Sequence, residues 1–179
     1  MIAVRNTFLL VLSMVAKLSM AESLCRPGEQ IAFSCSVKTH IVSLCAFTPS
    51  IKDMENMQYR FGTNSNTEFQ FPQIPLAHGK QFHLSSTSYG GGGETHLSFT
   101  NGRFEYIIYE RTTKGEEDQD GVRPTSFNAG VLVRKGKKRV AHHRCNSNEN
   151  AGISTFIYNV LPMEPFERLD HGVSTRSRK

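Results

Sequence analysis

The chain has 179 residues, a hydrophobic content of 38% and a formal net charge of +5. This length suits one domain with appendages, and the hydrophobic content suffices for a single sheet-based core. No basic stripe interleaved with aromatic residues occurs, which argues against a nucleic-acid-binding protein.

The first 21 residues have the organisation of a secretory signal peptide. Arg5 lies before a short apolar run at 8–16, and Ser19-Met20-Ala21 offers the small residues that a signal peptidase reads. Cleavage after Ala21 would also remove Lys17 and lower the net charge from +5 to about +3. A buried N-terminal helix is the alternative interpretation. We expect a secreted or periplasmic protein without a stable membrane anchor, because no later stretch is long and apolar enough to cross a bilayer.

Four cysteines follow this segment: Cys25, Cys35, Cys45 and Cys145. An even number in an exported chain predicts two disulfides, for which three connectivities are possible. A metal site is the competing interpretation, but no pair has the two-to-four-residue spacing of a zinc knuckle. We therefore predict no metal and no cofactor.

The first half of the chain contains short runs in which apolar residues alternate with polar ones, as in half-buried strands. Turn residues separate these runs, for example Asn64-Ser65-Asn66. The predicted strands are 30–37, 41–46, 58–62, 67–71 and 80–84.

The centre of the chain is a predicted hairpin, Glu94 to Arg111. Asn101-Gly102 suits the two central positions of a type I′ turn, both of which need φ > 0. The preceding run Ser88-Tyr89-Gly90-Gly91-Gly92-Gly93 is predicted to be a pliant loop, since glycine loses much backbone freedom on ordering.

The second half continues the strand pattern. Lys114 to Pro124 is a charged loop, 125–133 and 139–145 are predicted strands, and 154–161 is a last strand or edge. We expect one β domain over 22–161 and a disordered tail over 162–179. The fold class is all-β, a small antiparallel barrel or sandwich of about nine strands, stabilised by disulfides.

The mature chain resembles the periplasmic inhibitors of c-type lysozyme, which are small β-barrels. The resemblance rests on Phe33-Ser34-Cys35 in an early strand, on the Phe99-Thr100-Asn101-Gly102 hairpin, and on the strand that ends at Cys145. It implies disulfides Cys35–Cys145 and Cys25–Cys45.

Family members insert a Ser-Gly-containing loop into the lysozyme cleft. That pair aligns with Thr95-His96 here, and the nearest Ser and Gly residues lie a few positions earlier. The candidate partner-binding residues are therefore Ser88, Tyr89, Gly90, Gly91, Gly92, Gly93, Thr95 and His96.

Two charged segments offer further candidate sites. The basic patch, Arg134, Lys135, Lys137, Lys138 and Arg139, is either a solvated turn or a surface for an acidic partner or an anionic glycan. The acidic run 116–121 hints at calcium, but Phe127 stands where an EF-hand loop needs glutamate.

The strand pattern does not bring pairs of potentially catalytic side chains onto the same face. His142 and His143 should point to opposite faces of a strand, and so should Glu105 and Glu110. We therefore expect no enzyme. The predicted function is an exported protein-binding module, most concretely an inhibitor of a lysozyme-like glycosidase. The alternatives are a periplasmic immunity protein that neutralises a toxin and an anion- or glycan-binding module that uses the basic patch.

Overall fold

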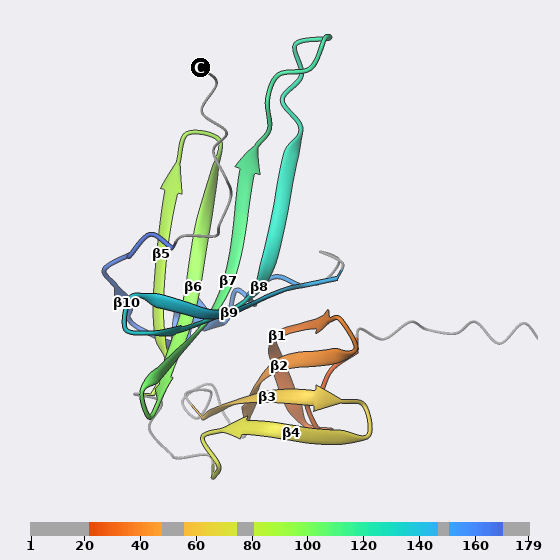
Figure 1. The fold of residues 1–179 in the computed structure, drawn as a ribbon, viewed down its shortest axis with the longest axis vertical. Coiled ribbons are helices and arrows are strands. Elements are labelled where there is room, and N and C mark those ends of the chain that lie inside the picture. Colours follow the sequence, from red (N-terminus) through yellow and green to blue (C-terminus); the bar gives the residue numbers. More distant parts are fainter. Residues whose placement is uncertain (1–21, 48–55, 75–80, 147–150, 170–179) are drawn as a thin grey trace, which may run out of the picture.

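The computed structural model describes residues 22–47, 56–74, 81–146 and 151–169. The predicted signal peptide lies outside these residues, as does the 170–179 part of the predicted tail. The described residues form two β-sheets and one short helix, α1 (Ile157–Val160) (Figure 1). No described helix has the length and the apolar character that crossing a membrane requires.

Sheet A contains, in spatial order, β1 (Glu29–Val37), β2 (His40–Phe47), β3 (Met57–Thr63) and β4 (Asn66–Phe71). Sheet B has the order β10-β5-β6-β7-β8-β9. Its strands are β5 (His83–Tyr89), β6 (Gly92–Asn101), β7 (Phe104–Lys114), β8 (Thr125–Lys135), β9 (Lys138–Arg144) and β10 (Met163–Glu164). The all-β prediction is confirmed, and the two sheets do not close into one barrel.

The core lies between the two sheets and is rich in aromatic residues. Phe33, Leu44 and Tyr59 of sheet A meet Leu97 and Phe99 of sheet B, and all five are at most 3% exposed. Leu97 and Phe99 occupy alternate positions on β6, whereas β2 is buried at six consecutive positions, 41–46, and so on both of its faces.

Two disulfides are present with the connectivity that the resemblance implied. Cys25 is bonded to Cys45 within the sheet A side of the molecule, and Cys35 of β1 is bonded to Cys145 directly after β9. The second bond ties sheet A to sheet B. Both are consistent with an oxidising extracellular or periplasmic environment.

The prediction of a strand over 154–161 is wrong. This segment forms a single helical turn, and Ile153, Ile157 and Leu161 are buried against the core. These three residues are spaced four apart, which is the period of a helix rather than that of a strand.

The central hairpin turns one residue later than predicted. Asn101 pairs with Phe104, so Gly102 and Arg103 are the central residues. Only Gly102 has positive φ, at 61°, as in a type II′ turn and unlike type I′.

The tail prediction is wrong for residues 162–169. β10 pairs in parallel with β5, and Phe166 stacks on His96. Leu169 is buried in a small cluster with Ile107 and Tyr109, on the face of sheet B that points away from sheet A. Apolar residues in this short, charged segment thus cover the outer face of the sheet.

Candidate functional site

The glycine run is a tight hairpin turn rather than a pliant loop. Ser88 and Tyr89 belong to β5, Gly92 and Gly93 belong to β6, and only Gly90 and Gly91 form the turn. A Cβ atom on Gly92 would lie 1.9 Å from the Thr112 carbonyl oxygen of β7. The glycines therefore let this hairpin pack closely against the neighbouring strand.

The predicted partner-binding residues divide between different environments. Ser88 and Gly90 are exposed at the turn. The Tyr89 hydroxyl donates to the carbonyl oxygens of Gly93 and Thr112, at 3.2 Å each, and accepts from Arg111 Nε. Tyr89 thus fastens the turn to β7 instead of projecting toward a partner.

Thr95 and His96 lie on opposite faces of β6. His96 is 4% exposed; its ring nitrogen lies 2.6 Å from a Glu94 carboxylate oxygen, and Phe166 covers it. Arg111 lies 3.6 Å from the same carboxylate. His96 therefore belongs to a buried polar network on the outer face and does not face the same partner as Thr95.

Thr95 lines a polar groove of about 390 Å³ below the glycine turn. The inner face of sheet B changes there from apolar side chains to hydroxyl groups, because the hairpins extend beyond sheet A (Figure 1). The groove is lined by Ser86, Ser88, Thr95, Glu110 and Thr112, with the adjacent Gly93.

Glu110 is the carboxylate of this groove. Burial raises its pKa, although the Ile153 N–H, at 2.7 Å, and the Thr95 hydroxyl both donate hydrogen bonds to it. The Thr95 hydroxyl also lies 2.8 Å from that of Tyr158. The groove is thus a hydrogen-bonding surface with one carboxyl group that keeps its proton to a higher pH than usual.

The acidic loop, residues 115–124, joins β7 to β8 and extends beyond the glycine turn (Figure 1). It carries four carboxylates and one arginine. Asp118 Oδ1 accepts from the Asp120 and Val122 N–H groups, and Glu117 pairs with Arg123 at 3.1 Å. Glu116 and Asp120 are exposed. The glycine turn and the acidic loop together form what we call the hairpin end.

The basic patch lies at the other end of β8, at the turn to β9. An 11-residue strand places the two turns roughly 33 Å apart. Arg134 is bound by Glu105 and Glu167, and these hydrogen bonds raise its pKa. Lys135, Lys137, Lys138 and Arg139 are exposed.

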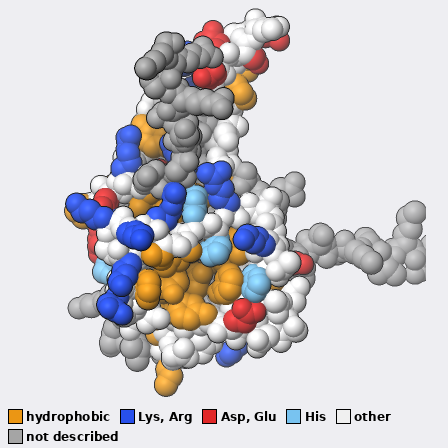
Figure 2. Space-filling model, viewed as in Figure 1, with side chains coloured by type: hydrophobic (Ala, Val, Ile, Leu, Met, Phe, Trp, Pro, Cys, Tyr) orange, Lys and Arg blue, Asp and Glu red, His pale blue; other side chains and the backbone are white. Residues whose placement is uncertain are grey.

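A second pocket, of about 420 Å³, opens between the two sheets, and the sequence did not reveal it. We call it the aromatic pocket; it is lined mainly by Tyr59, Phe61, Phe69, Phe104, Tyr106 and His143. Figure 2 shows it as an apolar patch bordered by Lys, Arg and His side chains. Sequence alone gave no signal for it, since inward-facing aromatic residues have the same pattern whether or not the sheets cover them.

The two glutamates and the two histidines that were predicted to lie on opposite faces of their strands do so. Glu105 binds Arg134 on the outer face of sheet B, whereas Glu110 faces the polar groove. His142 contacts the Tyr109 hydroxyl on the outer face, and His143 faces the aromatic pocket.

One cluster of potential metal ligands occurs among the described residues, at Cys25, Glu29 and Cys45. Its two sulfur atoms are bonded to each other, so it offers no thiolate ligand.

Comparisons of this chain with protein-family models, curated proteins and solved structures found no match.

Proposed function

We propose that this chain is an exported protein-binding module that contacts its partner through the hairpin end. The observation that carries the proposal is the arrangement along β8: the acidic loop adjoins the glycine turn, and the basic patch lies at the opposite end of the strand. The hairpin end therefore carries a surplus of carboxylates, four in the acidic loop against Arg123 and the nearby Lys114, away from the lysines of the basic patch.

The shape of the hairpin end supports a protein as the partner. The turn and the loop project beyond the core, and the polar groove beside them offers hydroxyl groups from both hairpins. Hydrogen-bonding groups on a rigid sheet suit the polar, partly hydrated contacts of a protein interface.

The most concrete partner is a lysozyme-like glycosidase. Lysozymes of the c-type are basic, and a negative surface accelerates and orients the encounter with a basic protein. At the turn, the groups accessible to a catalytic cleft are the Ser88 hydroxyl and the backbone N–H of Gly90. The resemblance to lysozyme inhibitors and the charge of the hairpin end point to the same target class.

The test is the lysis of cell-wall suspensions by a c-type lysozyme in the presence of stoichiometric amounts of the protein. We expect inhibition by the wild type and its loss in Glu116→Gln/Asp120→Asn, since neither side chain makes a contact that holds the loop. Gly90→Trp should also abolish inhibition, because the large side chain would obstruct contact between the turn and the lysozyme. It should not disturb the fold, since a Cβ atom at this position meets nothing within 4 Å.

The matched control is Lys137→Gln/Lys138→Gln, which changes two charges at the far end of β8 and should inhibit normally. Undiminished lysis at a molar excess of wild type would overturn the inhibitor assignment. Binding to a toxin encoded beside this gene would then identify an immunity protein. Retention on an anionic glycan with release by moderate salt would identify a glycan-binding module.

A further inference from the structure

The aromatic pocket has a different chemistry from the hairpin end and is independent of the function proposed above. Its volume of about 420 Å³ falls within the usual range of small-molecule sites, and its lining is mostly apolar. Two of its side chains remain notably open to solvent: Phe104 is 39% exposed and Val140 is 47% exposed. Apolar side chains gathered in an open pocket indicate a binding site.

A stack of aromatic rings shapes one side of this pocket. Phe71 and Phe99 have ring centroids 4.6 Å apart, Phe99 and Tyr106 4.8 Å, and Tyr106 and Phe69 5.4 Å. Their interplanar angles are 11°, 2° and 16°. Phe69 ends the stack on the side of the pocket, so a planar aromatic ligand that packs on Phe69 extends a series of nearly parallel rings.

Two phenol hydroxyls supply the polar groups of the pocket. Tyr59 is 3% exposed and Tyr106 is half-buried, and their rings lie 6.0 Å apart. Within the described parts of the chain, neither hydroxyl has a hydrogen-bonding partner. Neither oxygen is fully buried, so both hydroxyls are open to the pocket and can donate to a bound acceptor. Burial raises the pKa of both groups, so both are protonated donors at neutral pH.

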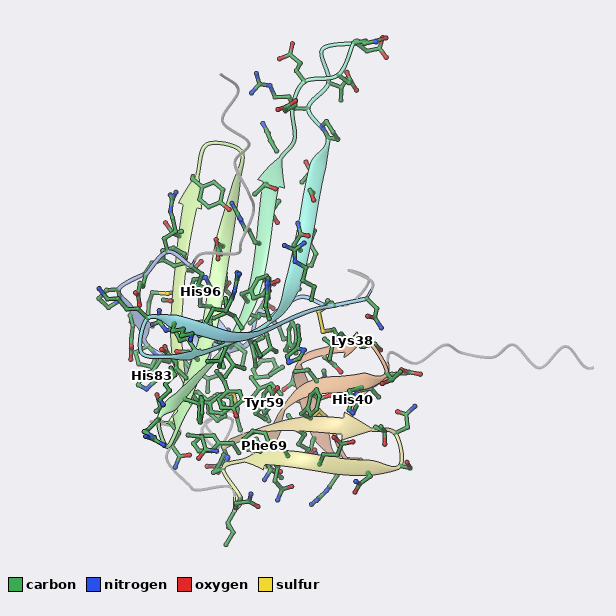
Figure 3. The ribbon with its side chains drawn as sticks, in the orientation of Figure 1. Lys38, His40, Tyr59, Phe69, His83 and His96 are labelled. Atoms are coloured by element: carbon green, nitrogen blue, oxygen red, sulfur yellow. A yellow bond between two sulfur atoms is a disulfide. The ribbon has the colours of Figure 1, made fainter. Side chains whose placement is uncertain are left out.

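One border of the pocket is formed by two histidines and Lys38. His40 stacks on Phe61 at 4.9 Å, and the His143 ring lies 6.2 Å from that of Phe61. Burial lowers the pKa of His143, and the charge of Lys38 lowers it further, so Lys38 and not His143 supplies the positive charge at neutral pH. Figure 3 shows Lys38 and His40 at the sheet A side of this border.

On β9, the exposed residues Lys138 and Arg139 directly precede the pocket residue Val140, and Lys and Arg side chains surround part of the apolar patch in Figure 2. The carboxylate nearest to this region by its contacts is Glu68, which pairs with His40 at 3.3 Å.

We propose that the aromatic pocket binds a small planar aromatic carboxylate, whose ring packs on Phe69 and whose carboxylate accepts hydrogen bonds from the Tyr59 and Tyr106 hydroxyls. The cationic border favours an anion over a neutral or cationic analogue of the same shape. Hydrogen bonds to a charged acceptor are stronger than those to a neutral one, which adds to this preference.

The test is a calorimetric titration of the oxidised protein with naphthalene-2-carboxylate, naphthalene-2-carboxamide and 2-naphthylmethylamine. We expect one saturable site for the carboxylate, at least tenfold weaker binding of the amide, and the weakest binding of the amine. Tyr59→Phe keeps the ring and removes the donor, and it should weaken carboxylate binding roughly tenfold. Lys38→Asn should weaken it two- to threefold; Asn tolerates the φ of +54° at this position.

Tyr158→Phe is the matched control, because its hydroxyl lies in the polar groove beside Thr95. It should leave the affinity unchanged. Equal binding of carboxylate and amide would overturn the proposal. So would a carboxylate affinity that neither Tyr59→Phe nor Lys38→Asn alters, and so would the absence of saturable binding at millimolar concentration.

Discussion

At the scale of single residues, the most demanding interaction is the ion pair between Arg60 and Glu29. Arg60 is 1% exposed, and its guanidinium contacts both Glu29 carboxylate oxygens, at 2.5 and 2.7 Å. It also donates to Gln58 Oε1 and to the Leu24 carbonyl oxygen. A buried guanidinium needs all of these acceptors, since removal of one partner leaves an uncompensated charge.

We predict that Glu29→Gln lowers the free energy of unfolding by about 3 kcal/mol at pH 7. Urea denaturation measures this change. The control Glu117→Gln removes a carboxylate from an ion pair that is more than half exposed, and it should cost less than about 0.5 kcal/mol. Similar losses in the free energy of unfolding for Glu29→Gln and Glu117→Gln would contradict the prediction that the buried ion pair matters more than the exposed one.

The same pair makes stability depend on pH. Burial opposes ionisation of Glu29, but hydrogen bonds from Arg60 and from the Arg26 N–H, with the charges of both arginines, hold its pKa below the ordinary value of 4.5. The stabilisation is therefore complete above about pH 4.5 and is lost as the pH falls through the folded-state pKa. The advantage of the wild type over Glu29→Gln in urea denaturation should therefore shrink as the pH is lowered below 4.5.

At the scale of elements, the β5–β6 hairpin depends on Gly92 more than on its exposed neighbour Gly90. We predict that Gly92→Ala destabilises the protein by about 2–3 kcal/mol, because the new methyl group collides with the Thr112 carbonyl oxygen and the strands must separate. Gly90→Ala should change stability by less than about 1 kcal/mol. Equal unfolding midpoints in urea would contradict this packing.

Most strands of the fold could be predicted because their burial follows a period of two. Leu97 and Phe99 alternate with His96, Ser98 and Thr100, and they mark a strand with one face in the core. A strand was predicted over 154–161, where the structure has one helical turn, because a single turn contributes too few apolar positions to show a helical period. Phe166 lies outside any periodic run, so its contact with His96 depends on tertiary structure alone.

The candidate surfaces were harder to predict than the strands. The sequence marks the glycines and the charged loops, but their relation depends on sheet order, which sets the acidic loop beside the glycine turn. Likewise, Tyr89 and His96 looked accessible to a partner, and both hold other parts of the fold. The aromatic pocket appears only when the two sheets are placed against each other.

At the scale of the whole molecule, the Cys35–Cys145 disulfide joins the two sheets across 110 residues, whereas Cys25–Cys45 spans 20. In the chain-entropy model the longer loop contributes more, about 4–5 kcal/mol against about 3 kcal/mol. We therefore predict that Cys35→Ala/Cys145→Ala lowers stability more than Cys25→Ala/Cys45→Ala. Guanidinium denaturation of both variants measures the difference, and the reverse order would contradict the prediction.

The placement of opposite charges at the two ends of β8 gives the molecule an electric dipole along its length. Bacterial and host cell surfaces are mostly anionic, so a molecule within a Debye length of such a surface experiences a torque. Beside such a surface, the lysines at the β8–β9 turn would be attracted to it, and the glycine turn would be directed into the surrounding medium.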